Sequence, residues 1–131
     1  MKLTTSMYLM GTLLVGLTST ASADVITDWN EKVVNASLAA RQPPPVQAKN
    51  IAMVHLAMFD ALNSIEQRYT PYHVQLQVPN TTSREAAVSA AAHYLMVRLY
   101  PDQLKDSDAA LKATLALGAG WGRQGAGRAT R

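Results

Sequence analysis

Apolar residues recur at intervals of three or four along most of the chain, the spacing that places them on one face of an α-helix. Four segments show this periodicity and predict helices over Val25–Ala40, Val46–Ile65, Ser83–Tyr100 and Leu104–Leu117. The sequence therefore predicts an all-α protein, built as a partial helical bundle of about four helices.

Prolines and a capping pattern delimit these helices. Pro43–Pro45 must end the first, because proline lacks an amide hydrogen and disfavours helical geometry in the residue before it. Proline is nevertheless favourable in a first turn, so Pro45 can open the second helix. Thr82 and Glu85 have the spacing of a capping box, which predicts the start of the third helix there, and Pro101 ends that helix.

The second and third predicted helices carry complementary faces. The second has a bulky stripe of Ile51, Val54, Met58, Phe59, Leu62 and Ile65. We expect this stripe to lie against a face of small residues on the third helix, formed by Ala86, Ala87, Ala90, Ala91 and Ala92. His55 would then be buried at the contact, bonded to a backbone carbonyl or to a polar side chain such as Asn30. Uncovered apolar surface on this pair predicts self-association.

The C-terminal segment, residues 118–131, has a different composition. It is rich in glycine and contains no aliphatic residue larger than alanine. Such a segment buries too little apolar surface to offset the entropy lost on ordering, so we expect it to be disordered. The domain organisation expected for the chain is therefore a helical segment over residues 24–117 followed by this tail.

The N-terminal residues 1–23 have the three zones of a cleavable signal peptide. Lys2 supplies a positive start, Met7–Leu17 is an apolar run, and Ala21–Ala23 ends in small residues that signal peptidase accepts. The run is shorter than the about 20 apolar residues needed to span a bilayer. We therefore expect cleavage before Asp24 and a periplasmic or secreted product without a membrane span.

Composition excludes several classes of site. The chain has no cysteine, which excludes disulfides, thiolate metal sites and a cysteine nucleophile. The formal net charge is only +3, and the excess arginines cluster at the C-terminal end. Because nucleic-acid binding usually requires a strongly basic face, no nucleic-acid partner is expected.

The histidines and aspartates are the candidate catalytic or metal-binding residues. On the second helix His55 and Asp60 are about 140° apart, so they do not face one site. His93 shares its helical face with no carboxylate, and His73 falls in a loop expected to be exposed. Asp102, Asp106 and Asp108 flank the start of the fourth helix, where the helix dipole favours negative charge. A metal-dependent hydrolase that brings His55 and His93 together remains a third, minor hypothesis.

A set of short motifs occurs in a fixed order along the chain. These are Asp28-Trp29-Asn30, Arg41-x-Pro43-Pro44-Pro45, His55-x-Ala57-Met58-x-Asp60-Ala61-x-Asn63, Tyr69-x-Pro71-Tyr72, Ala90-Ala91-Ala92-His93 and Leu99-Tyr100-Pro101. Together they resemble the N-terminal helical region of bacterial vanadium-dependent haloperoxidase-like proteins, of the type 2 phosphatidic acid phosphatase superfamily. The resemblance covers about Val25 to Leu117 and implies a helical bundle that binds phosphate or vanadate.

The oxyanion-binding motifs of that family are not found in this chain. Lys32 and Arg41 are too far apart for the family's Lys-x6-Arg-Pro, and no histidine follows glycine as in Pro-Ser-Gly-His. Ser83-Arg84 could begin the third motif, Ser-Arg-x5-His-x3-Asp, but His93 comes too late. No catalytic, cofactor-binding or metal-binding residue is assigned, and no cofactor is expected in this chain. Vanadate or phosphate belongs to the full-length family.

Two main hypotheses about function follow. The first is a truncated haloperoxidase- or phosphatase-like exported protein, inactive alone. The alternative is a small exported helical binding or interaction module. A fragment that lacks half of its bundle should be molten or aggregate, whereas a true module should unfold cooperatively.

Overall fold

The computed structural model describes residues 24–126, with side chains described as far as Leu117. Its elements are α1 (Val25–Ala39), α2 (Pro44–Glu66), α3 (Arg84–Leu99), the short 3₁₀ helix η1 (Pro101–Gln103) and α4 (Leu104–Ala126). The described residues contain no strand. The predicted all-α bundle of four helices is therefore confirmed.

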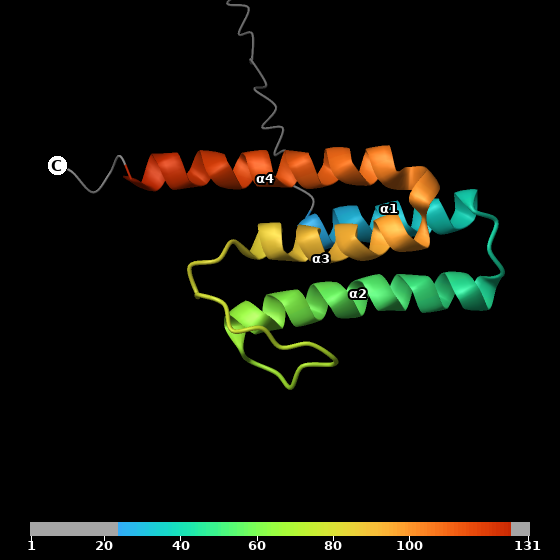
Figure 1. Ribbon diagram of the computed structural model, residues 1–131, viewed down its shortest axis with the longest axis horizontal. Coiled ribbons are helices and arrows are strands. Elements are labelled where there is room, and N and C mark those ends of the chain that lie inside the picture. The colour runs from blue at the N-terminus through green and yellow to red at the C-terminus, as the bar shows by residue number, and fades with distance from the viewer. Residues whose placement is uncertain (1–23, 127–131) are drawn as a thin grey trace, which may run out of the picture.

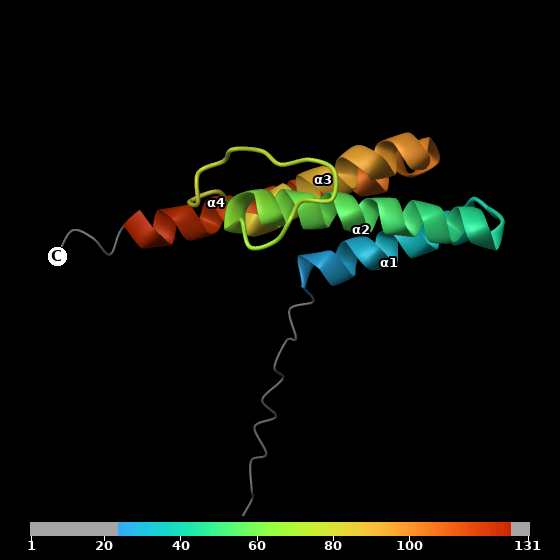
Figure 2. The same ribbon diagram turned by 90° about the horizontal axis from the view of Figure 1, so that it is seen from below.

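The helix α3 lies at the centre of the bundle and packs against α1, α2 and α4 (Figure 1). The helices α1 and α2 also pack on each other, and a long irregular segment, residues 67–83, connects α2 to α3. Figures 1 and 2 show this connection curving beside the C-terminal half of α2. Because α1 and α4 each pack on α3 while sharing few contacts, the surface between them stays open.

One hydrophobic core joins the helices. It consists of Trp29, Val33, Ala36, Val54, Met58, Val88, Ala92, Met96 and Tyr100. The expected packing of α2 on α3 is confirmed. The face predicted for α3 is only partly correct, because Ala92 is buried as expected but Ala90 is exposed and the larger Val88 and Met96 are buried. Turning the larger side chains inward removes more apolar surface from water than burying alanine does.

Phe59 also differs from its prediction. It was placed in the buried stripe of α2 but is 36 % exposed, whereas Val54 and Met58 are buried. One residue along a helix rotates a side chain by about 100°, so Phe59 turns away from the core. Its ring lies instead near that of Tyr69, with 6.1 Å between the ring centroids.

The start of α2 agrees with the prediction, and the start of α3 differs from it in the capping residue. Pro44 and Pro45 occupy the first turn of α2, as expected for residues whose missing amide would be unbonded there anyway. The N-cap of α3 is Ser83, not Thr82, and its hydroxyl accepts a hydrogen bond from the Ala86 amide at 3.2 Å. Ser83 is the residue adjacent to the first helical turn, so its side chain is the one that reaches the unbonded amide.

The helix α4 continues to Ala126 and does not end at Leu117 as predicted. Each glycine costs roughly 1 kcal/mol relative to alanine inside a helix, but no proline interrupts this segment. The rest of the predicted disordered tail, residues 127–131, lies outside the described residues, as does the predicted signal peptide, residues 1–23. No helix within residues 24–126 has the length and apolar character that crossing a membrane requires.

Candidate functional site

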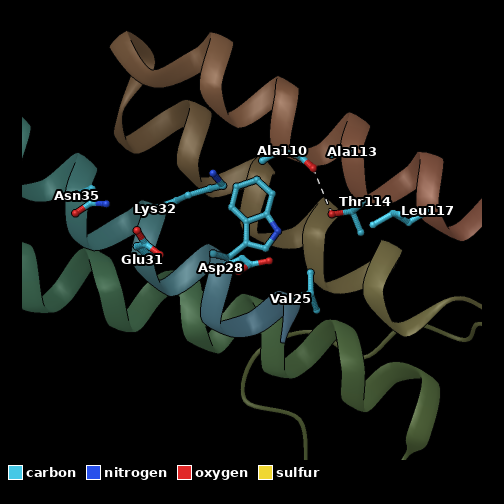
Figure 3. Close-up of a pocket in the computed structure, with 10 residues that line it drawn as sticks. Val25, Asp28, Glu31, Lys32, Asn35, Ala110, Ala113, Thr114 and Leu117 are labelled. Atoms are coloured by element: carbon cyan, nitrogen blue, oxygen red, sulfur yellow. Dashed lines mark hydrogen bonds between the residues drawn. The ribbon is translucent and has the colours of Figure 1, made fainter. Parts of the chain in front are cut away.

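A groove runs between α1 and α4 (Figure 3). Its volume is about 360 Å³, near the lower end of the roughly 300–1,000 Å³ typical of ligand pockets. It is lined from α1 by Val25, Asp28, Trp29, Glu31, Lys32 and Asn35, and from α4 by Ala110, Ala113, Thr114 and Leu117. Two helices far apart in sequence therefore form its walls.

Trp29 is the one buried residue among those that line this groove. The residue is 1 % exposed, and its indole Nε1 donates a hydrogen bond to Ser89 Oγ of α3 at 3.0 Å. Because a buried indole N–H needs a partner, this bond holds the ring in one orientation. On the opposite wall the Thr114 hydroxyl donates to the Ala110 carbonyl at 3.2 Å, so it is already bonded within α4.

Leu117 gives the groove an exposed apolar edge. Its side chain is 69 % exposed, at the end of the groove where Val25 and Thr114 also lie (Figure 3). Asp28 and Glu31 are exposed and carry charge along the α1 side. An apolar interior with charged margins suits the apolar face of an amphipathic helix.

A second organised region is the connection between α2 and α3, which is held by the buried carboxylate of Asp60. This carboxylate accepts hydrogen bonds from the backbone amides of Tyr72, His73 and Val74 at 2.7, 2.8 and 2.8 Å. The residue is only 6 % exposed. We call this set of contacts the Asp60 clamp. It ties the connection to the last turns of α2.

The charge state of Asp60 follows from these contacts. Burial acts to raise the pKa of its carboxyl, but the bonds from Val74, Tyr72 and His73, with the nearby His73 side chain, lower the pKa below its usual value. Hydrogen bonds donated to a carboxylate stabilise its ionised form. Asp60 is therefore an ionised structural anchor and is unsuited to act as a general acid.

Two neighbours of Asp60 extend the clamp. Asn63 Oδ1 accepts from the amides of Arg68 and Tyr69 at 3.1 and 2.9 Å, while its Nδ2 donates to the Tyr69 carbonyl at 2.7 Å. The Ser64 hydroxyl accepts from the Leu76 amide at 3.0 Å. Sequence reasoning missed this role, because Asp60 was compared only with His55 on its own helix.

The histidines enter separate contacts. His55 Nε2 lies 2.9 Å from Asn30 Oδ1, so the predicted partner is confirmed, although the side chain is only partly buried. His93 Nε2 lies 2.7 Å from Asp108 Oδ1 of α4. The helix-dipole interpretation of Asp108 is therefore incomplete, since it considered each helix alone. His73 is exposed, as predicted.

These placements bear on the metal-hydrolase hypothesis. His55 bonds to α1 and His93 to α4, so the fold does not direct the two rings at a common ligand. Among residues 24–126, no group of three or more histidine, aspartate or glutamate side chains is placed to hold a metal ion. The third hypothesis therefore has no support from the geometry.

A buried polar network joins α1, α2 and the end of α3. The Tyr100 hydroxyl lies 2.6 Å from Ser37 Oγ, accepts from Asn50 Nδ2 at 3.2 Å and donates to Gln42 Oε1 at 3.2 Å. Several residues of the sequence motifs thus stabilise the fold. Tyr100 does so in this network, and Asp60 and Asn63 do so in the Asp60 clamp.

The basic residues considered for an oxyanion site are separated. Lys32 lines the groove, Arg41 is exposed at the turn after α1, and Arg84 Nε pairs with Glu66 Oε1 at 2.9 Å. Arg68 pairs with the same glutamate at 3.3 Å. Glu66 is the last residue of α2 and Arg84 the first of α3, so their ion pair links the two ends of the connection between these helices.

Comparison with known proteins finds no matching protein-family model, no matching curated protein and no matching solved structure. The resemblance to haloperoxidase-like proteins therefore stays a prediction that rests on the ordered motifs alone.

Proposed function

We propose that this chain is an exported, non-catalytic helical module, the N-terminal part of a haloperoxidase- or phosphatase-like bundle, and that its α1–α4 groove docks a further helix. The observation that carries the proposal is the open groove itself, with Trp29 at its base and Leu117 69 % exposed at its edge. In a complete bundle such a surface lies against another helix.

The roles of the motif residues support a scaffold. Asp60 and Asn63 bind backbone amides of the connection, and Tyr100 lies in a buried network. Side chains engaged in this way stabilise the fold. Lys32, Arg41 and Arg84 lie apart, so within the described residues these three cations do not surround one oxyanion as a phosphate or vanadate site requires.

The alternative, a self-contained interaction module, is favoured by one observation. Trp29, Val33 and Met58 are each at most 2 % exposed, in a core shared by α1, α2 and α3. Such close packing is expected of a domain that unfolds cooperatively. The two possibilities share the same groove and differ in what covers it: helices of the same bundle, or a separate protein.

Dye binding tests the groove directly. The chain from Asp24 onward should bind a dye specific for exposed apolar surface, and Leu117→Asp should reduce that binding. The control is Leu38→Asp, because Leu38 is similarly exposed (59 %) but does not line the groove. Equal dye binding by the two variants would contradict a role for the groove.

Activity assays test the proposed absence of catalysis, and the downstream nucleotide sequence tests the proposed family relationship. We expect no vanadate-dependent bromination and no phosphatase activity above a blank without protein. Activity proportional to protein concentration would refute a non-catalytic role.

Downstream nucleotide sequence that encodes Pro-Ser-Gly-His in any frame would support the family relationship, whereas unrelated sequence would contradict it. A sharply melting monomer that binds no dye would favour the interaction module.

A further inference from the structure

The connection between α2 and α3 contains a segment with the pattern of a β-strand. Residues 74–78 read Val-Gln-Leu-Gln-Val, in which apolar and polar residues alternate strictly and no charge or proline occurs. Such alternation, with β-branched residues at both ends, is typical of a strand. We call residues 74–78 the edge segment. Because the structure contains no strand within residues 24–126, the edge segment has no partner strand there.

Side chains of α2 hold one edge of this segment. The Val74 amide donates to Asp60 Oδ2 at 2.8 Å, and the Leu76 amide donates to Ser64 Oγ at 3.0 Å. The two acceptor residues are four positions apart, or about 6 Å along the helix axis. Every second residue of an extended chain is separated by about 6.6 Å. The spacing therefore matches an extended backbone that runs alongside α2.

The opposite edge of the segment faces away from α2. Gln75 and Gln77 alternate with the two anchored residues, so their backbone amides and carbonyls point to the other side. Within residues 24–117 no hydrogen bond joins these backbone groups to another part of the chain, and both side chains are exposed. A row of unpaired backbone groups of this kind can pair with another strand.

The sequence of the edge segment selects a second copy as that strand, because it reads the same in both directions. Antiparallel pairing about a two-fold axis at Leu76 sets this residue opposite itself and Gln75 opposite Gln77 of the second copy. The glutamines are then the pairs that exchange backbone hydrogen bonds, and the apolar residues are the closer pairs between them. This register uses the same edge that α2 leaves free. We infer that two copies of this chain pair, antiparallel, through the edge segment.

Exposed apolar side chains add to this contact. Val74 and Leu76 are 44 % and 56 % exposed, and Tyr72, just before the segment, is 69 % exposed. Stable interfaces bury at least about 1,200 Å², which is more than two five-residue strands can cover, so the dimer is weak. Because α2 holds the other edge, a third strand cannot add and the assembly closes at two copies. The edge segment does not line the α1–α4 groove, so this contact is independent of the proposed docking function.

Charge exchange at the two glutamines tests the register. In sedimentation velocity, the full chain should change from monomer to dimer as its concentration rises. Gln75→Lys with Gln77→Lys sets like charges opposite each other and should weaken the dimer at least about tenfold, whereas Gln75→Lys with Gln77→Glu sets opposite charges together and should restore it. A chain that stays monomeric up to about 1 mM would overturn the inference. Equal dimerisation by all three chains, or no restoration by the Lys and Glu pair, would also overturn it.

Thiol cross-linking tests the two-fold contact itself, since the chain has no native cysteine. Opposed residues of a non-hydrogen-bonded pair have Cα atoms about 4.5 Å apart, a separation that a disulfide can bridge. Oxidation by diamide should therefore convert Leu76→Cys to a covalent dimer at least about tenfold faster than Leu38→Cys, where the natural side chain is similarly exposed (59 %) but lies on α1. Equal rates would overturn the inference. A dimer that Leu117→Asp abolishes and the two lysines leave unchanged would identify the α1–α4 groove as the contact, which contradicts it.

Discussion

Replacing Asp60 should release the connection between α2 and α3 while leaving the helices formed. The carboxylate accepts three backbone hydrogen bonds of 2.7–2.8 Å, and no other acceptor is shown for these amides. In Asp60→Ala these amides must form hydrogen bonds with water instead, and this requires the connection around Tyr72–Val74 to move away from α2.

The magnitude follows from these bonds. A hydrogen bond to a charged group contributes roughly 1.5–3 kcal/mol, so three set an upper limit of roughly 4.5–9 kcal/mol. Removing the carboxylate also removes the cost of burying its charge, and the freed amides regain water. Leaving a buried donor without its acceptor costs about 1–3 kcal/mol, and amides that reach water recover part of this. We therefore expect Asp60→Ala to lower the free energy of unfolding by about 3 kcal/mol.

The pH dependence has a definite sign. Folding lowers the pKa of Asp60, so its stabilising contribution is complete above the unfolded-state pKa of about 4 and is lost as the pH falls through the lower folded-state pKa. The difference in stability between the natural chain and Asp60→Ala should therefore be constant near neutral pH and shrink below about pH 4.

Urea unfolding followed by far-ultraviolet circular dichroism measures the loss, and trypsin cleavage after the exposed Arg68 reports release of the connection. The matched control is Glu31→Ala, an exposed carboxylate on α1, which should change stability by less than about 0.5 kcal/mol. If Asp60→Ala unfolds within 0.5 kcal/mol of the natural chain and is cleaved no faster, the Asp60 clamp does not stabilise the fold.

Three other predictions concern the core and the N-terminus. Met58 is 2 % exposed and Met53 is 37 % exposed on the same helix, so Met58→Asp should abolish cooperative unfolding by circular dichroism while Met53→Asp retains it. Ser89→Ala should cost about 1–3 kcal/mol in urea unfolding, because it leaves the buried indole N–H of Trp29 without its acceptor; an unchanged midpoint would contradict this. Mass spectrometry of the exported protein should show Asp24 as its first residue, and retention of residues 1–23 would overturn the predicted cleavage.

The local pattern of the sequence was sufficient to predict the helices. Apolar periodicity and the prolines place α1, α2 and α3 to within a few residues, because these signals act through the backbone of the segment that contains them. For His55 the sequence left a backbone carbonyl or a polar side chain such as Asn30 as the partner, and the structure shows Asn30. The end of α4 was placed too early, since glycine weakens a helix without ending it as proline does.

Only the tertiary structure decided which surfaces and polar groups meet. The pairing of His93 with Asp108, the amides that Asp60 binds, and the groove between α1 and α4 each join segments that are distant in the chain. Periodicity along one helix defines which residues share a face, but the neighbour that covers the face depends on how all the helices pack together. For this reason the sequence determined an all-α bundle and the boundaries of α1, α2 and α3. The packing around α3 determined which residues face the core and left the groove open.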